Sequence, residues 1–319
     1  MRFVVYGAGA IGGVIGARLH QHGHEVVLIA RGAHLEAIRA RGLRIESADV
    51  AEAVAIPAVA HPSEIAWRAD DVVLLAMKTQ HSAGALEELV GCVPPGSAIA
   101  CAQNSVENER LALRRFARVY GIAVMCPAAH LEPGVVQAYA APVTGILDVG
   151  CWPAGSDETA RAIAGAFSAS TFVSEPRADI ARWKYRKLLM NIGNAVQALC
   201  ASGGGELVKR AQEEGEACLR AAGIPFASEA EDRERRGDLL RMHPIAGRRR
   251  AGGSTWQSLE RASGSVETDY LNGEIVLLGR LHGVPTPVNA LLQRLAADAA
   301  RTRRPPGTLT EDALLRLLR

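Results

Sequence analysis

The chain has 319 residues, of which 48% are hydrophobic and 22% charged, a composition typical of globular proteins and a length sufficient for two domains. The formal net charge at pH 7 is +2, which gives no electrostatic reason to expect a nucleic acid or a membrane surface as partner. Six widely spaced cysteines, an apolar strand that starts at residue 2 and no apolar run of about 18 residues favour a cytoplasmic protein with reduced thiols.

The first 30 residues predict a strand, a glycine-rich turn, a helix and a second strand. The glycine pattern G-x-G-x-x-G in this setting is typical of a Rossmann-type dinucleotide site. Gly7 permits the tight turn, Gly9 lets a pyrophosphate approach the backbone, and Gly12 allows the helix to pack closely on the strand. With Ala10 and Ile11 between them, these glycines form the predicted cofactor loop at the N-terminus of the helix.

The end of the second strand bears on the choice between NADP and NAD. An NAD site usually places Asp or Glu there to bind the ribose 2′-hydroxyl, whereas this chain has Arg31. A guanidinium binds a 2′-phosphate bidentately and gains much less from a bare hydroxyl. We therefore expect NADP(H); the alternative for Arg31 is a solvated loop arginine.

Three histidines, His20, His22 and His24, fall close together at the end of the first helix. They straddle a helix end and a strand start, so they are poorly placed to converge on one ion. We expect no metal site, and a helix closed by Gly23 accounts for the pattern more simply.

Polar residues end two further apolar strands of the predicted sheet. Lys78 follows VVLLAM, and Asn104 follows AIACAQ. The carboxyl ends of parallel strands face the ligand crevice, so both residues are candidates to touch cofactor or substrate. Ordinary loop chemistry is the alternative for each. We expect a hairpin at about 43–57 and more elements up to 175, namely strands at 118–125, 135–139, 144–149 and 171–175 and a helix at 157–168.

From about residue 177 the alternation of strand and helix stops and helical periods take over. We therefore predict an N-terminal α/β Rossmann-type domain at 1–175 and an all-α domain at 176–319, with a ligand cleft between them.

The helical stretch KLLMNIGNAV (187–196) carries Lys187, Asn191 and Asn194 at i, i+4 and i+7, on one predicted helical face. A lysine and two carboxamides aimed in one direction suit a substrate site, in which the lysine donates a proton. Lys184, one turn earlier, is the second candidate for proton donor. The alternative is that Lys187 reaches solvent along an apolar surface and the asparagines cap neighbouring backbone.

A glycine-rich segment later in the helical half leads into another helix. It follows a basic run, Arg248–Arg250, which we interpret as a solvated loop. Ser254 and Thr255 stand at the predicted helix start, where a hydroxyl and free N–H groups can bind a carboxylate. Downstream, Glu267 and Asp269 precede an apolar helix, so capping competes with chemistry for these carboxylates.

Taken together, these residues resemble the ketopantoate reductase (2-dehydropantoate 2-reductase) family over nearly the whole chain. The likeness covers GAGAIG, Arg31-Gly32, Lys78, Gln103-Asn104, KLLMN (187–191) and VETDYLNGEIVLLGRLHGVPTPVN (266–289). The last run is the most specific.

The resemblance implies NADPH-dependent reduction of a 2-oxo acid, 2-dehydropantoate to pantoate, in pantothenate and coenzyme A biosynthesis. It implies Lys187 as general acid and Glu267 as a catalytic residue that also contacts cofactor and substrate. It places Asn104, Asn191 and Asn194 at the substrate, together with Ser254 or Thr255 on its carboxylate. Lys78 and Asn104 would lie near the nicotinamide, and Arg31 on the 2′-phosphate. The assembly that we expect is a homodimer.

Three departures from the family pattern concern the substrate side. The second asparagine of the helix is Asn194, where the family commonly places it one residue later. The segment with the carboxylate-binding serine reads GSTWQSLE, and counting back from Glu267 favours Thr255 over Ser254. Ser105 replaces a glycine common after the strand-end asparagine.

Two other functions remain open from the sequence. One is an NADP-dependent dehydrogenase for a different 2-oxo or 3-hydroxy acid, or an imine-reducing relative. The other is a catalytically silent protein that binds NADPH as a sensor.

Overall fold

A computed structural model describes residues 1–48, 50–247 and 250–318 of the chain. Contacts divide the chain into two compact units, of which unit 1 comprises Met1–Lys184 and Glu229–Arg250, and unit 2 comprises Tyr185–Ser228 and Ala251–Arg319. The first unit thus extends beyond the boundary predicted at residue 175. Unit 1 also includes residues 229–250, which lie within the range predicted for the second domain.

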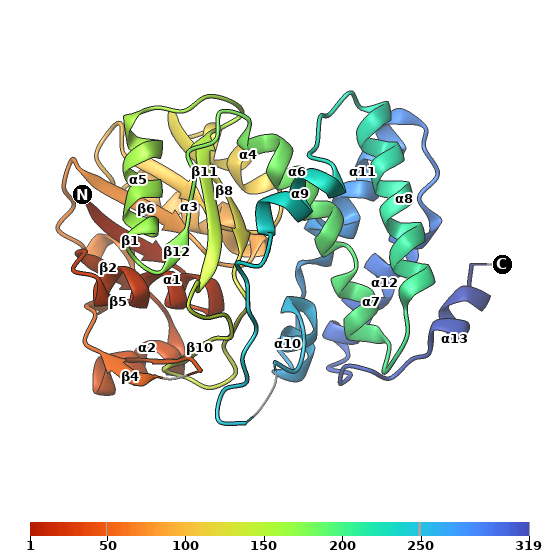
Figure 1. The fold of residues 1–319 in the computed structure, drawn as a ribbon, viewed down its shortest axis with the longest axis horizontal. Coiled ribbons are helices and arrows are strands. Elements are labelled where there is room, and N and C mark those ends of the chain that lie inside the picture. The colour runs from red at the N-terminus through yellow and green to blue at the C-terminus, as the bar shows by residue number, and fades with distance from the viewer. Residues whose placement is uncertain (49, 248–249, 319) are drawn as a thin grey trace. The chain divides into compact units, whose positions relative to one another are not determined.

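Unit 1 contains a twisted sheet of eight strands in the order β12-β11-β8-β7-β6-β1-β2-β5 (Figure 1). Neighbouring strands run parallel except for β8 and β11. The strands are β1 (Arg2–Tyr6), β2 (Val26–Ile29), β5 (Ala58–Val59), β6 (Asp71–Leu75), β7 (Ala98–Cys101), β8 (Arg118–Met125), β11 (Gly145–Cys151) and β12 (Phe172–Val173). The predicted Rossmann-type α/β domain is confirmed.

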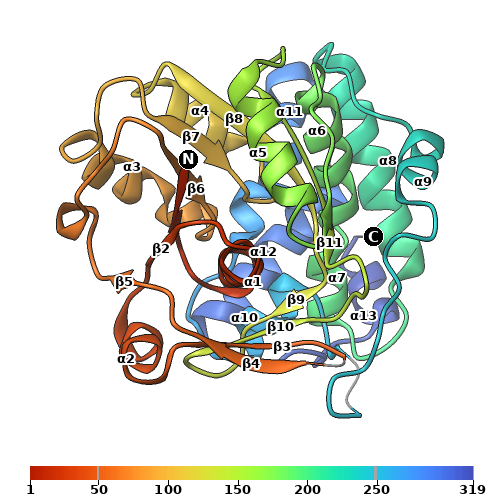
Figure 2. The same cartoon turned by 60° about the vertical axis from the view of Figure 1, so that its left-hand side comes forward.

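Helices cover both faces of this sheet because its central strands are apolar on both sides (Figures 1 and 2). Phe3, Val5 and Leu74 pack in one core cluster with residues of α1 and α5, whereas Val73 and Leu75 face α3 and α4 in another. The helices of unit 1 are α1 (Ala10–Gln21), α2 (Gly32–Arg41), α3 (Ser82–Val90), α4 (Glu107–Leu113), α5 (Glu158–Ser168) and α9 (Glu229–Arg236), with 3₁₀ helices η1 (Pro62–Glu64) and η2 (Thr79–His81).

The hairpin predicted at about 43–57 is present as antiparallel strands β3 (Leu43–Glu46) and β4 (Ala51–Val54). It does not join the large sheet. Instead, β3 pairs with β10 (Val135–Ala138), which pairs with β9 (Ala128–Ala129), to give a second sheet of four strands in the order β4-β3-β10-β9.

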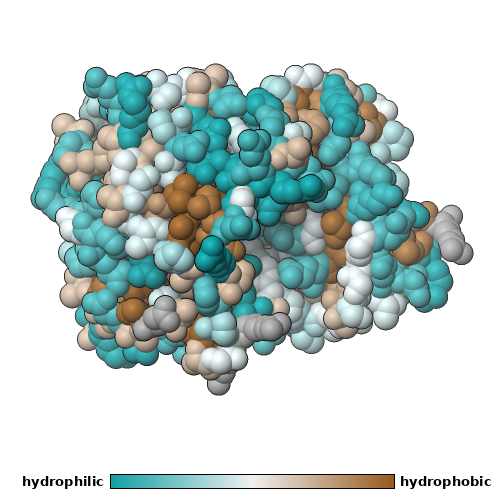
Figure 3. Space-filling view, viewed as in Figure 1, coloured by the Kyte–Doolittle hydropathy of each residue, from teal (hydrophilic) through white to brown (hydrophobic). Residues whose placement is uncertain are grey.

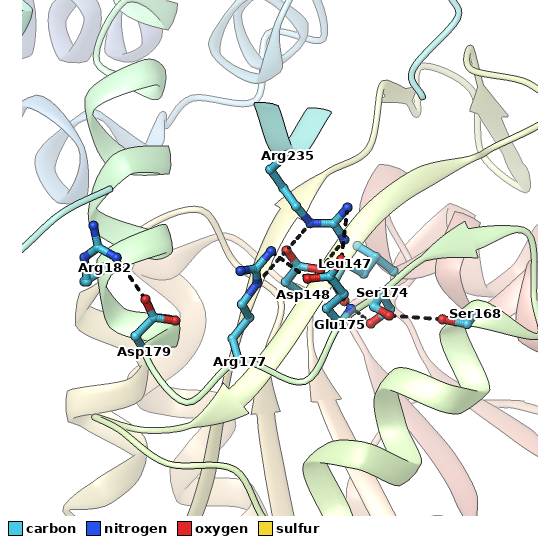
Figure 4. A network of polar contacts seen from close by, with 9 residues as sticks. All are labelled: Leu147, Asp148, Ser168, Ser174, Glu175, Arg177, Asp179, Arg182 and Arg235. Atoms are coloured by element: carbon cyan, nitrogen blue, oxygen red, sulfur yellow. Dashed lines mark hydrogen bonds and ion pairs between the residues drawn. The ribbon is translucent and has the colours of Figure 1, made fainter. Parts of the chain in front are cut away.

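Charged side chains attach α9 to the large sheet (Figure 4). Arg235 of α9 donates bidentately to Asp148 of β11, at 2.9 and 2.7 Å. Asp148 is 2% exposed and also accepts from Arg177 at 3.3 Å and from the Glu175 backbone at 2.9 Å. Arg182 pairs in turn with Glu231 of α9. Ion pairs therefore hold α9 on the sheet. Farther along the returning segment, Ile245 packs in an apolar cluster with Ala129 and Tyr139.

The predicted basic loop follows α9 along this segment. Arg248 and Arg249 lie outside the described residues. Arg250 donates from Nε to the carbonyl oxygen of Ala128 at 3.3 Å, and burial lowers the pKa of its guanidinium. Arg250 is therefore half-buried, contrary to the solvated interpretation.

Unit 2 is helical, as predicted. Its elements are the later turns of α6 (Ile180–Asn191), then α7 (Asn194–Leu199), α8 (Gly205–Ala221), α10 (Ser254–Glu260), η3 (Glu267–Tyr270), α11 (Asn272–His282), α12 (Pro287–Arg301) and α13 (Glu311–Arg316). Within this helical half, the stretch from 258 to 283 is divided among α10, η3 and α11.

The helix predicted through residues 187–196 is also divided, since α6 ends at Asn191 and α7 begins at Asn194. Side chains from elsewhere satisfy the carbonyls at this break. Gln212 of α8 donates to the Leu189 oxygen at 3.3 Å, and Asn272 of α11 donates to the Ile192 oxygen at 3.1 Å. A Cβ at Gly193 would lie 3.3 Å from Val208, so α8 also passes close to the break.

Hydrophilic residues cover most of the face seen in Figure 3, with apolar residues gathered in small groups. Among the residues in the three described ranges, no helix combines the length and the apolar character needed to cross a membrane.

Candidate functional site: a dinucleotide loop and a lysine–asparagine helix

Four strands of unit 1 end at the same level of the large sheet. Tyr6 of β1 is in register with Ile29 of β2 and with Leu75 of β6, and Leu75 is in register with Cys101 of β7. The order of the strands reverses at β1, because β2 lies on one side of it and β6 and β7 on the other. The segments that carry Gly7, Arg31, Lys78 and Asn104 therefore all leave the sheet at the edge where α/β proteins bind dinucleotides.

The glycine loop between β1 and α1 has the geometry that such a ligand requires. Gly7 has φ +101°, and a Cβ on it would lie 2.6 Å from the Met77 backbone nitrogen. A Cβ on Gly12 would lie 2.9 Å from Val5 of β1, so the helix packs directly on the strand. Gly9 faces open space, with nothing within 4 Å of an added Cβ.

The N-terminus of α1 remains available to an anion in this geometry. Gly9 is the N-cap, no side chain caps the helix within the described chain, and its first turn, which contains Ala10 and Ile11, has no acidic residue. The backbone N–H groups and the helix dipole thus fit a pyrophosphate.

Arg31 is exposed at the end of β2, where it forms the N-cap of α2. Its Nη2 lies 3.3 Å from Nε2 of His81, which ends η2 after β6. Tyr6 hydrogen-bonds to Glu88 nearby; burial and Glu88 raise the pKa of the phenol, whereas Arg31 opposes the shift. No local pattern singles out His81, because its ring nitrogen meets Arg31 only where the segments that follow β2 and β6 come together beside β1.

Lys78 and Asn104 occupy corresponding positions after β6 and β7. Both are half-buried. Lys78 is the N-cap of η2, and Asn104 lies between two buried residues, Gln103 and Ser105.

Lys184 does not have the surroundings expected of a second proton donor. It is 1% exposed, and its ammonium forms an ion pair with Glu109 of α4. The same Nζ donates to the carbonyl oxygens of Cys101 at 3.3 Å and Gln103 at 2.9 Å. Burial raises the pKa of Glu109, although Lys184 opposes the shift. Lys184 therefore anchors the end of β7, and its ion pair with Glu109 argues against it as the second candidate for proton donor.

Lys187 and Asn191 are one turn apart on α6, in unit 2. Lys187 is half-buried, and Asn191 is 6% exposed. Nδ2 of Asn191 is buried and has no hydrogen-bond partner within the described chain. A buried hydrogen-bond donor without a partner costs about 1–3 kcal/mol. An asparagine kept at such a position therefore points to a ligand that accepts its hydrogen bond.

Asn194, the first residue of α7, lies beside the start of α10. A Cβ at Gly253 would lie 3.3 Å from Oδ1 of Asn194, and the Gly253 nitrogen donates to Oε1 of Gln197 at 3.0 Å. The structure thus brings the second asparagine next to the glycine that precedes Ser254. Ser254 is half-buried, whereas Thr255 is 3% exposed.

Glu267 begins η3 and is 4% exposed. The next residue, Thr268, has a buried Oγ1 without a partner in the part of the chain that the structure describes. Two adjacent buried polar side chains therefore mark the start of η3.

The clustered histidines have separate surroundings. Nδ1 of His22 lies 2.8 Å from the Arg18 carbonyl oxygen, and His24 packs edge-on against Phe3. No group of three or more His, Cys, Asp or Glu residues suited to a metal ion occurs within residues 1–48, 50–247 and 250–318.

A Rossmann-type sheet with a dinucleotide loop, continued by a helical unit, is an architecture typical of oxidoreductases that use a nicotinamide dinucleotide. Comparison with known families agrees. Residues 3–154 match the family described as ketopantoate reductase PanE/ApbA, and residues 179–300 match its C-terminal domain. The chain belongs to the ketopantoate reductase family.

Similar proteins align with nearly the whole chain. The 2-dehydropantoate 2-reductase of Pyrococcus horikoshii is 27% identical over 310 residues, which cover 92% of this chain and 96% of that protein. The crystal structure of a PanE/ApbA family ketopantoate reductase from Ralstonia eutropha JMP134 is 27% identical, with a TM-score of 0.78 and coverage of 95% and 100%. D-mandelate dehydrogenase, solved with NADH and anilino(oxo)acetate, shares the fold, with a TM-score of 0.80, 21% identity and coverage of 95% and 99%.

Proposed function

We propose that this protein is an NADPH-dependent reductase that converts a 2-oxo acid to a 2-hydroxy acid. The proposed substrate is 2-dehydropantoate, which gives pantoate for pantothenate and coenzyme A biosynthesis. The observation that carries the proposal is the buried Nδ2 of Asn191, one turn from Lys187, which has no partner among the described residues of this ketopantoate reductase family member.

The reaction consumes one hydride and one proton for each carbonyl reduced. NADPH supplies the hydride when it is bound. Lys187 gives a proton from its ammonium group to the oxygen that develops negative charge, and solvent reprotonates the amine. Asn191 and Asn194 hold the substrate by hydrogen bonds without changing the net charge.

The remaining assignments follow the resemblance. Glu267 orients the substrate and also contacts the cofactor, and Lys78 and Asn104 lie at the cofactor and substrate. A hydroxyl of Ser254 or Thr255 binds the substrate carboxylate; the greater exposure of Ser254 favours it over Thr255, which the residue count from Glu267 had favoured.

The first test removes the proposed proton donor. Lys187→Ala should lower kcat at least about a hundredfold and leave NADPH affinity nearly unchanged, because general acid catalysis contributes roughly 10²–10⁴ in rate. Oxidation of NADPH is followed with 2-dehydropantoate beside pyruvate, 2-oxoisovalerate and bulkier 2-oxo acids, with NADH as a control. If the variant turned over as fast as the wild type, Lys187 would not be the proton donor. Tight NADPH binding without turnover on any 2-oxo acid would favour a sensor.

The second test concerns the cofactor. The guanidinium of Arg31 and the imidazole of His81 can receive a 2′-phosphate together, whereas NADH offers them only a hydroxyl. Arg31→Ala should therefore raise KM for NADPH about ten- to a hundredfold and change KM for NADH little. The matched control is Arg39→Ala, which removes another exposed arginine of the same region, paired with Glu64. Equal effects on both cofactors would overturn the choice of NADP.

A different 2-oxo acid is the second candidate, and the position of Asn194 one residue before the family's usual asparagine favours it. The substrate panel separates the two, since kcat/KM would then be highest for an acid other than 2-dehydropantoate. The homodimer stays a prediction, which light scattering on the purified protein tests.

A further inference from the structure

Five buried polar side chains form one hydrogen-bonded network between the segments that follow β6 and β7 in unit 1. Each is at most 4% exposed, and they are Thr79, Ser82, Gln103, Ser105 and Asn108. Residues of these types usually occupy caps and turns at the surface, so five of them buried together need a reason.

Asn108 of α4 is the centre of the network. Its Nδ2 donates to Oγ of Ser105 at 2.8 Å and to Oγ1 of Thr79 at 3.1 Å. Its Oδ1 accepts from Oγ of Ser82 at 2.6 Å. The hydroxyl of Thr79 also donates to that of Ser105 at 3.1 Å, and Nε2 of Gln103 donates to Ser82 at 3.0 Å.

The network is attached by single peptide bonds to two proposed ligand residues. Thr79 directly follows Lys78, and Gln103 and Ser105 flank Asn104. The network members are buried, whereas Lys78 and Asn104 between them are half-buried. Fixing the network therefore fixes the backbone from which both ligand residues project.

A second contact secures the same strand end. The ammonium of Lys184 donates to the carbonyl oxygen of Gln103 at 2.9 Å and pairs with Glu109, the neighbour of Asn108. Oε1 of Gln103 and Oε2 of Glu109 have no hydrogen-bond partner among the described residues, but the hydroxyl and amide groups that join the two segments are paired with one another. Losing one of these partners leaves another buried polar group unpaired, so the network favours one conformation.

We propose that the network centred on Asn108 and Ser105 positions Lys78 and Asn104 as one pair for cofactor and substrate. Ser105 is the key member, because its hydroxyl accepts from both Thr79 and Asn108 and thereby joins the two segments. These are positioning residues that act through Lys78 and Asn104. The proposal rests on the proposed function and extends it.

The test is a double-mutant cycle between Ser105 and Asn104. Ser105→Ala should lower kcat/KM for the 2-oxo acid about five- to tenfold, the effect of one lost hydrogen bond. In the Asn104→Ala background the same change should lower it less than about twofold, because residues that act through one another are not additive. Ser105→Gly introduces the residue that is common at this position in the family and should have the same effect as Ser105→Ala. If the alanine variant does not fold, the glycine variant serves for the test.

The matched control is Ser97→Ala at the other end of β7. Ser97 is 3% exposed, and its hydroxyl donates to the Pro94 carbonyl oxygen at 2.8 Å. It should lower the melting temperature about as much as Ser105→Ala but leave kcat/KM unchanged. Equal kcat/KM for the Ser97 and Ser105 variants, or additive effects of Ser105 and Asn104, would overturn the proposal.

Cofactor binding supplies a readout that needs no turnover. Ser105→Ala should weaken NADPH binding, measured by fluorescence titration, in the wild-type background and not in Lys78→Ala. If the wild type reduces no 2-oxo acid, the proposed function fails, and this titration alone decides the inference. Equal weakening in both backgrounds would contradict it.

Discussion

Two buried asparagines of unit 2 differ in their hydrogen bonds. Nδ2 of Asn272 donates to the Ile192 carbonyl oxygen at 3.1 Å and to Oδ1 of Asn289 at 3.0 Å. Nδ2 of Asn191 is also buried and has no partner among the residues that the structure describes. A partnered amide stabilises the fold, whereas an unpartnered one destabilises it until a ligand accepts its hydrogen bond. The same residue type thus serves structure at one position and recognition at the other.

The difference predicts opposite effects of the same substitution. Asn272→Ala should lower the free energy of unfolding by about 1–3 kcal/mol, because it leaves buried acceptors unpaired. Asn191→Ala should leave that free energy unchanged or higher and raise KM for the 2-oxo acid about five- to tenfold. Urea denaturation and steady-state kinetics on both variants measure the contrast. Similar destabilisation by the two would show that Asn191 is structural.

At the scale of elements, carboxylates from distant parts of the chain cap helices that lack caps of their own. Glu311 of α13 accepts from the backbone nitrogens of Gly204, Glu206 and Leu207 at the start of α8, at 2.8, 2.9 and 3.1 Å. Glu214 of α8 accepts in turn from the nitrogens of Val288 and Asn289 in the first turn of α12. The helices of unit 2 therefore depend on one another at their ends as well as along their apolar faces.

The cap of α8 predicts a pH-dependent contribution to stability. The backbone N–H groups lower the pKa of Glu311 in the folded protein, so its contribution is present above the ordinary glutamate pKa of about 4.3 and is lost as the pH falls through the lower, folded value. Glu311→Gln should lower the free energy of unfolding by about 1 kcal/mol at neutral pH. The difference from wild type should shrink in acid, as the pH falls below about 4.3 and through the lower, folded pKa.

The control for this prediction is Asp312→Asn, which neutralises the neighbouring exposed carboxylate of α13. Urea denaturation of the wild type and both variants, at neutral pH and in acid, measures the free energies to be compared. A loss of stability in Glu311→Gln that persists in acid would mean that shape, and not charge, matters at this position.

At the scale of the whole molecule, the chain crosses between its units more than once. Residues 229–250 return to unit 1 after α8, and ion pairs to Asp148 hold α9 there (Figure 4). Charged helices such as α9, which reads EAEDRERR, have no apolar face to bury. Their placement therefore depends on whether a buried partner such as Asp148 is present.

Arg235→Met should release this segment. It should lower the free energy of unfolding by the lower end of the roughly 3–5 kcal/mol expected for a broken buried pair, since Arg177 still contacts Asp148. Hydrogen exchange of residues 229–247 should rise before that of the sheet. Arg233→Met is the control, because Arg233 pairs only with Glu229 on the exposed side of the same helix among the described contacts. Equal hydrogen exchange in the two variants would show that the ion pair of Arg235 with Asp148 does not hold this segment.

Local patterns in the sequence determined the α/β unit and its cofactor loop. The strand ends, the positive φ of Gly7 and the contact of Gly12 with Val5 follow from the glycine spacing and from apolar runs bounded by turns. The helical character of the second half followed in the same way. These features are encoded within about 30 residues at a time, where periodicity and turn chemistry act.

Only the tertiary structure decided which polar residues are partnered. Lys184 pairs with Glu109, Glu311 caps a distant helix, and Arg31 meets His81 across segments far apart in sequence. Nδ2 of Asn191, by contrast, has no partner in the described part of the chain. No local pattern contains that information, because a hydrogen bond between distant segments depends on the packing that brings them together and on the burial that makes an unpaired group costly.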